Sequence, residues 1–141
     1  MNITYLNCDG KDKLFSFYRH DFKIKEIEGI EYMIDGGQQD YIRASEKGIL
    51  EKGEIKDLIL DIRQQFTWGK NFDKNNNRLP ETQYILLKDL DTDHILNILS
   101  YFTNNLYNKV IQNENKVDKE WCIIHEIFIQ GLIYRNETII K

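Results

Sequence analysis

The feature that most constrains the fold is an apolar stripe in the middle of the chain. Ile55, Leu58, Ile59, Ile62 and Phe66 recur at positions i, i+3, i+4, i+7 and i+11, which is the period of one face of an α-helix. We predict a helix over residues 54–66, with acidic side chains in its first turn, where they suit the helix dipole. The simplest role for the stripe is packing in a core.

The residues before this helix are typical of strands. Residues 14–45 carry β-branched and aromatic side chains in partial alternation, and we expect the first strand over 13–19. Glu28-Gly29 fits a two-residue hairpin turn. Gly36-Gly37 interrupts the pattern, which then resumes. The sequence predicts an antiparallel meander of three to five strands, with residues 1–50 mainly in strands.

The residues after the central helix are polar and rich in turn formers. Residues 67–83 contain Gly69, three consecutive asparagines and the only proline, Pro80, so we predict a surface loop there. A loop of this length in a compact domain is often functional, although disorder is an alternative. A short buried strand is expected at residues 84–87.

Two more helices are predicted, over residues 93–111 and 118–135, the first of them capped by Asp91 or Thr92. The last helix is apolar on more than one side. One stripe comprises Trp121, Ile124, Phe128 and Leu132, and further apolar residues off this stripe are Ile123, Ile127, Ile129 and Ile133. We expect this helix to pack on the sheet and also in a subunit interface, giving a homo-oligomer.

These elements predict an α+β fold, with an N-terminal antiparallel β-meander packed against two to three C-terminal α-helices. The 141 residues suit a single domain spanning 1–141. The 41% apolar and 30% charged content is ordinary for a globular protein, and no apolar run is long enough for a membrane span. A net charge of −4 disfavours a binder of long nucleic acid, which needs a basic face.

The compartment is predicted from the amino terminus and the cysteines. The first ten residues lack the basic segment and apolar run of a signal peptide, which indicates a cytoplasmic protein. Cys8 and Cys122 lie far apart in sequence without metal-type spacing, so two free thiols are expected.

No catalytic or metal signature is present. His20, His94 and His125 are isolated in sequence, and the Asn-rich turn at residues 73–77 lacks the glycine and glutamate of a calcium loop. No glycine-rich nucleotide loop and no nucleophile motif occurs. We therefore expect no cofactor, no metal and no catalytic residue, hence a protein that is not an enzyme.

A ligand-binding site is nevertheless suggested by side chains around two glycine-containing stretches. Aromatic rings here can stack on a base, arginines and a lysine can meet phosphates or a ribose, and glycine amides can cradle a phosphate. The candidate ligand-binding residues are Arg19, His20, Asp35, Gly36, Gly37, Tyr41, Arg43, Arg63, Trp68 and Lys70. Among them Arg43 is the residue we expect to matter most.

Several of these residues also have a purely structural interpretation. A pair of glycines between strands is usually a turn, and Arg63 can simply pair with a carboxylate. Trp68 is either an anchor for the following segment or a platform for a ligand. His20 is equally compatible with a binding role and a structural one.

Five short motifs, in this order and spacing, resemble a small-protein family widespread in phage genomes. They are Arg19-His20-Asp21-Phe22, Ile34-Asp35-Gly36-Gly37, Asp40-Tyr41-Ile42-Arg43, Ile62-Arg63-Gln64-Gln65-Phe66-Thr67-Trp68-Gly69 and Thr92-Asp93-His94-Ile95. The chain is similar to the phage anti-Thoeris sponges. That resemblance implies binding of a small nucleotide-derived signal, a cyclic ADP-ribose isomer, and its sequestration without cleavage in the cytoplasm of the infected bacterial host. A TIR-based defence effector would then stay inactive.

Two other functions are compatible with the same residues. The chain could be a protein-binding inhibitor or a structural phage protein that uses its apolar last helix as the contact face. A nucleotide hydrolase with Asp35 or His20 as base is the least supported, because one acid and one histidine lack the metal or nucleophile that such chemistry needs.

Overall fold

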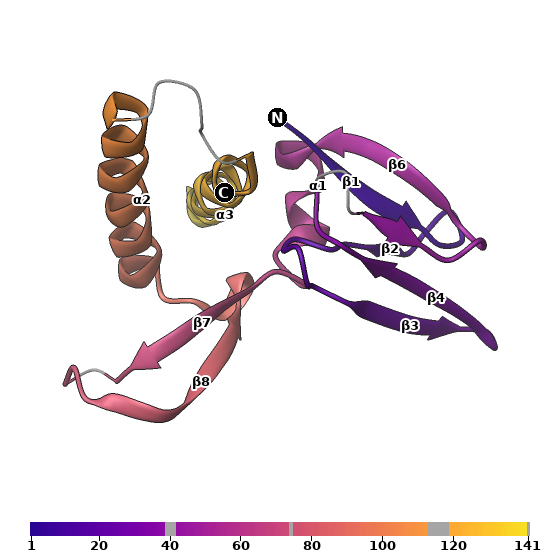
Figure 1. Cartoon of the computed structure of the whole chain (residues 1–141), viewed down its shortest axis with the longest axis horizontal. Helices are drawn as coiled ribbons and strands as arrows, with labels where there is room; N and C mark the ends of the chain where they lie inside the picture. The colour runs from indigo at the N-terminus through magenta and orange to yellow at the C-terminus, as the bar shows by residue number, and fades with distance from the viewer. Residues whose placement is uncertain (39–41, 74, 113–118, 141) are drawn as a thin grey trace.

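The computed structural model describes residues 1–38, 42–73, 75–112 and 119–140 and shows an α+β fold, with antiparallel sheets in the N-terminal part and a long helix at the C-terminus (Figure 1). In chain order the elements are β1 (Asn2–Asn7), β2 (Lys13–Leu14), β3 (Lys23–Ile27), β4 (Ile30–Asp35), β5 (Arg43–Ala44), β6 (Ile49–Glu54), α1 (Ile55–Ile62), β7 (Thr67–Phe72), β8 (Arg78–Leu86), the 3-10 helix η1 (Leu87–Asp89), α2 (Thr92–Gln112) and α3 (Lys119–Ile140).

The N-terminal strands form two antiparallel sheets. One has the order β2-β1-β6 and the other the order β3-β4-β5, so the predicted meander corresponds to the second sheet. In the first sheet, β1 pairs with β6 over its whole length, from Asn2 opposite Glu54 to Asn7 opposite Ile49. Such a pairing joins residues almost fifty positions apart, which local sequence patterns do not reveal.

The predicted hairpin turn between β3 and β4 is confirmed. Ile27 lies opposite Ile30 across the turn, and both turn residues have positive φ, 50° at Glu28 and 80° at Gly29. A two-residue turn with two left-handed residues matches the twist of the strands that it joins.

The strand predicted over residues 13–19 is wrong beyond Leu14. Phe15, Ser16 and Phe17 belong to no strand and Tyr18 lies in a bend. Side chains bind the backbone of this segment in place of a neighbouring strand. The Gln65 amide accepts from the Phe15 N–H and donates to the Lys13 carbonyl, at 3.1 and 2.6 Å. The Gln38 amide donates to the Ser16 carbonyl at 2.7 Å. These bonds satisfy the backbone without a sheet ladder.

The surface loop predicted over residues 67–83 is also wrong. This segment forms most of a two-stranded antiparallel hairpin, β7 and β8, in which Trp68 lies opposite Ile85 and Gly69 opposite Tyr84. The Asn-rich run is only the tip of the hairpin, where the Asp73 carboxylate accepts from the Asn75 and Asn77 N–H groups at 2.8 and 2.9 Å. Polar residues predominate because one face of the hairpin is open to solvent.

The main core joins the first sheet to all three helices. β1 is buried on both faces: Ile3 and Tyr5 point into this core, and Leu6 belongs to a smaller cluster with residues of β4. Phe66 lies at the centre, with ring centroids 5.1 Å from Phe17 and 5.4 Å from Phe128.

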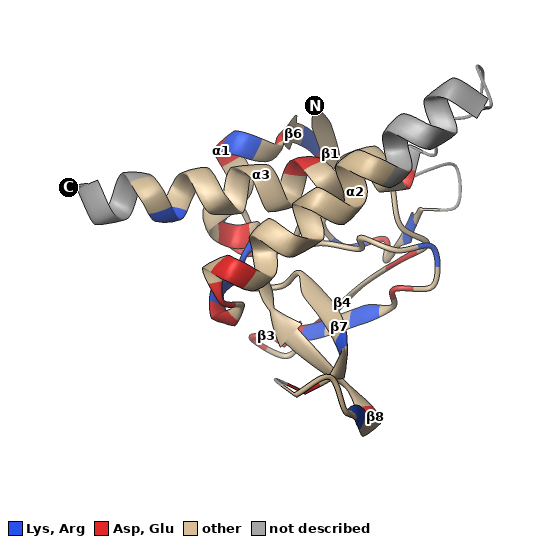
Figure 2. Ribbon diagram, turned by 90° about the vertical axis from the view of Figure 1, so that its left-hand side faces the viewer, with Lys and Arg blue, Asp and Glu red and all other residues tan. Residues whose placement is uncertain are grey.

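The C-terminal helix lies beside both α1 and α2 of the same chain (Figures 1 and 2). Ile123, Ile124, Ile127 and Phe128 are all buried in the main core. The apolar residues on its several faces are thus largely covered within one chain. An additional subunit interface through this helix stays a prediction. Ile133, which is 41% exposed, is an apolar residue that such an interface could cover.

Candidate functional site

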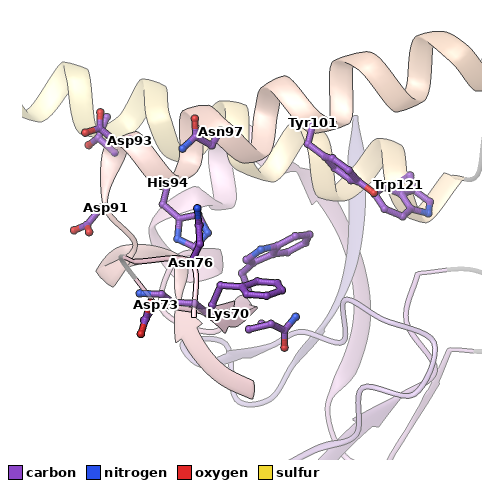
Figure 3. Close-up of a pocket in the computed structure, with 14 residues that line it drawn as sticks. Lys70, Asp73, Asn76, Asp91, Asp93, His94, Asn97, Tyr101 and Trp121 are labelled. Carbon is purple, nitrogen blue, oxygen red and sulfur yellow. The ribbon is translucent and has the colours of Figure 1, made fainter. Parts of the chain in front are cut away.

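A groove separates the start of α2 from the hairpin that precedes it. Alternation along β7 places Trp68 and Lys70 on one face of the hairpin, and helical spacing places His94, Asn97 and Tyr101 on one face of α2. All five residues line the same groove, which has a volume of about 1220 Å³ (Figure 3).

The chemistry of this groove changes from one end to the other. In Figure 3 Tyr101 and Trp121 are drawn at one end of the groove, and Asp91 and Asp93 at the other. His94 lies between them and points from α2 toward the hairpin. The groove therefore offers aromatic surface, hydrogen-bonding groups and charge to a single small molecule, and most of its lining residues are polar.

Trp68 packs against the main core and also lines the groove. Its ring packs edge-on against Phe102 and Phe128, at centroid distances of 5.7 and 5.3 Å. This packing fixes the base of the hairpin on α2 and α3. Of the two roles considered for Trp68, the anchoring role is observed, and the same residue also lines the groove.

A second, smaller groove of about 520 Å³ is lined by residues before β3 and by the base of the hairpin, including Tyr18, His20, Trp68 and Tyr84. The Tyr18 hydroxyl donates to the Thr67 carbonyl at 3.0 Å and so ties these segments together. Burial raises the pKa of the Tyr18 hydroxyl above its usual value, so it stays a neutral donor. This groove is mainly aromatic in character.

The glycine pair does not present free amides to a ligand. The Gly36 N–H donates to the Asp35 carboxylate at 2.8 Å, and the Gly37 N–H donates to the buried Ser16 hydroxyl at 2.9 Å. The Ser16 hydroxyl in turn donates to the Asp21 carbonyl at 2.6 Å. The Asp35-Gly36-Gly37 stretch therefore connects the end of β4 to the segment around Ser16. This agrees with its structural interpretation as a turn.

None of the three predicted arginines lines either groove. Arg43 lies opposite Asp35 in the β4–β5 pair and is exposed. The Arg63 guanidinium stacks on the Tyr134 ring at 4.8 Å from its centroid. The backbone N–H of Arg19 donates to the Glu120 carboxylate at 3.1 Å. Tyr41 lies outside the described residues.

The structure thus brings together Trp68 with Lys70 in the larger groove and Trp68 with His20 in the smaller one. Sequence reasoning missed Asn97 and Tyr101 and treated His94 only as an isolated histidine. A signal was present, because these three residues repeat at i, i+3 and i+7 on a face of the helix that does not carry its apolar stripe.

Among the residues that the structure describes, no three His, Cys, Asp or Glu side chains come together as a metal site. Within the same residues, every helix is too short or too polar to cross a membrane. Comparison with protein-family models, curated proteins and solved structures finds no match to the chain.

Proposed function

We propose that this protein binds a small nucleotide-derived molecule in the groove between β7 and α2 and holds it without chemical change. The observation that carries the proposal is the convergence of Trp68 and Lys70 from β7 with His94, Asn97 and Tyr101 from α2 around one groove. Aromatic rings suit a base, amides and carboxylates suit ribose hydroxyls, and the lysine suits a phosphate.

The available contacts are sufficient for tight binding. Stacking of a base on an aromatic side chain contributes about 1–3 kcal/mol, and a hydrogen bond to a charged group about 1.5–3 kcal/mol. Two ring contacts and three or four polar contacts could thus approach the roughly 12 kcal/mol of a nanomolar complex. Binding without turnover agrees with the absence of catalytic motifs in the sequence.

The biological role that we propose follows from the resemblance to phage anti-Thoeris sponges. Binding of a cyclic ADP-ribose isomer would lower its free concentration in the cytoplasm of the infected bacterium, and the TIR-based defence effector would not be activated. A sponge needs affinity and abundance but no catalysis.

Isothermal titration calorimetry with cyclic ADP-ribose isomers tests this function, followed by heating of the complex and identification of the released ligand. Intact ligand is expected. Lys70→Ala should weaken binding by about 10- to 100-fold, because it removes a charge-assisted contact. Tyr101→Ala should weaken it similarly through lost stacking. Trp68→Ala is unsuitable, since Trp68 also packs in the core.

Arg43→Ala is the matched control. Arg43 is an exposed cation on β5, outside the lining of the groove, so its loss should leave affinity unchanged. The reverse pattern, loss of binding in Arg43→Ala and none in Lys70→Ala, would place the site at the glycine pair. No binding, or release of a degraded ligand, would refute sequestration.

A second function, binding of a partner protein, is supported by exposed aromatic residues on the hairpin. Phe72 is 51% exposed and Tyr84 is 73% exposed, and aromatic side chains of this kind are enriched at protein interfaces. Copurification of one host protein with the wild-type chain, lost in Tyr84→Ala, together with flat thermal shifts for nucleotides, would favour this function over the first.

A further inference from the structure

We infer that the groove between β7 and α2 selects, among nucleotide-derived molecules, those with a ribose diol and few phosphate groups. The planar base would lie at the end formed by Tyr101 and Trp121, and the ribose hydroxyls at the end formed by Asp91 and Asp93. This inference deepens the proposed function and depends on it.

The aromatic end of the groove is accessible. Tyr101 is 58% exposed and is drawn at the same end of the groove as Trp121 in Figure 3. Trp121 itself packs at 4.8 Å against the buried Phe102 ring, which holds the indole in place. A fixed ring beside an exposed ring suits stacking with a flat heterocycle.

The opposite end of the groove is acidic. Asp91 directly precedes α2 and Asp93 lies in its first turn (Figure 3), and carboxylates accept hydrogen bonds from neighbouring hydroxyl groups in charge-assisted geometry. Asn97 lies on the same helix, between this end and the rings, and can both donate and accept. A ribose diol satisfies these acceptors, whereas a phosphate would be repelled by them.

The charge of the lining limits how many phosphates can be held. Its charged residues are one lysine, Lys70, and three aspartates, Asp73, Asp91 and Asp93, a formal charge of −2 with His94 neutral. Arg135 does not line the groove, but its guanidinium lies close to the acidic end, where it donates to the Thr92 hydroxyl and the Leu87 carbonyl at 3.3 and 2.7 Å. Its positive charge reduces the negative potential there. Lys70 can neutralise one phosphate charge, but each further phosphate charge is repelled by the aspartates of the lining.

Calorimetry with adenosine, 2′-deoxyadenosine, AMP, ADP, ATP and the cyclic ADP-ribose isomers, at one low salt concentration, tests the inference. Adenosine should bind, AMP should bind comparably, and each further phosphate should weaken binding on the order of threefold through charge repulsion. The deoxynucleoside should bind about tenfold more weakly, because it loses one charge-assisted hydrogen bond.

The outcomes distinguish the inference from the proposed function. If binding tightens from adenosine to ATP, if the deoxynucleoside binds as well as adenosine, or if only the cyclic isomers bind, the inference is overturned and the proposed function stands. If none of these compounds binds, both fail.

A charge variant provides a second, independent readout. Asp93→Asn should narrow the preference for adenosine over ATP by about threefold, because it removes one negative charge from the acidic end. Asp57→Asn removes a charge from an exposed position in the first turn of α1, outside the lining, and should leave the preference unchanged. Equal effects of the two variants would show that the selectivity comes from overall charge, and would overturn the placement at Asp93.

Discussion

Gly37 lies against the backbone of Tyr18 in the left-handed region, with φ of 75°. A Cβ atom there would come within 2.9 Å of the Tyr18 carbonyl carbon and oxygen, which no side-chain movement can relieve. The nearby hydrogen bond from the Gly37 N–H to Ser16 needs the same close approach. Glycine is therefore required at this position for packing, independently of any ligand.

Gly37→Ala should lower the free energy of unfolding by about 3 kcal/mol or more, from left-handed strain plus the steric clash. Gly10→Ala is the matched control, since Gly10 has a similar φ of 85° but open space around a Cβ, and it should cost only about 1–2 kcal/mol. Urea unfolding measures both. Equal losses would mean that the contact with Tyr18 is not rigid.

At the scale of elements, the hairpin of β7 and β8 is held at its base and free along much of its length. Trp68 anchors it to α2 and α3, and the Tyr18 hydroxyl bonds the Thr67 carbonyl. The position of the hairpin sets one wall of the groove, so the Tyr18 bond supports the site without lining the larger groove.

Stability should therefore depend on the ionisation of Tyr18 at alkaline pH. Burial raises its pKa in the fold above the usual tyrosine value of about 10, so above pH 10 the unfolded state loses this proton first and the free energy of unfolding falls as pH rises. The slope from one such group is at most about 1.4 kcal/mol per pH unit.

Tyr18→Phe removes the contribution of Tyr18 ionisation to the pH dependence of stability. At neutral pH it should lower the free energy of unfolding by about 1 kcal/mol, because the hydrogen bond to Thr67 is lost. Urea unfolding between pH 8 and 11 should show wild type losing stability faster than the variant above pH 10. Parallel profiles would contradict the assignment, because the other tyrosines are common to both proteins.

At the scale of the whole molecule, β1 couples the two apolar clusters. Ile3 and Tyr5 belong to the main core with α3, whereas Leu6 packs with Cys8, Leu14 and Ile34 in the smaller cluster. Because β1 contributes side chains to both clusters, its displacement would disrupt both of them at once. The sheets and the helices should unfold as one cooperative unit.

Two probes in different regions test this cooperativity. Trp68 and Trp121 report on the helical part by fluorescence, and Cys8, which is 6% exposed, reports on the sheets by its reactivity toward a thiol reagent. Burial raises the pKa of Cys8 and so keeps it unreactive in the fold. In a Cys122→Ser background the two urea midpoints should coincide; labelling of Cys8 at lower urea would show that the sheets open separately.

The sequence alone determined the elements whose signal is local. The apolar stripe from Ile55 to Phe66 predicted α1, with an end four residues too late, because the chain turns after Ile62 and brings Phe66 into the core. Glu28-Gly29 predicted a hairpin because only these two residues decide the turn. Trp68 and Lys70 were predicted as ligand contacts from their chemistry; they line one groove, and ligand binding by them stays a prediction.

Only the tertiary structure decided which distant segments meet. Two features join residues far apart in sequence: the pairing of Asn2–Asn7 with Ile49–Glu54, and the groove between the β7–β8 hairpin and α2. Periodicity reports which face of an element is buried, but it contains no information on what that face meets. For this reason all the candidate residues looked like one site in the sequence. In the structure Arg43 lies opposite Asp35 and the Arg19 backbone lies beside Gly37, while Trp68 and Lys70 line a groove to which none of these residues contributes.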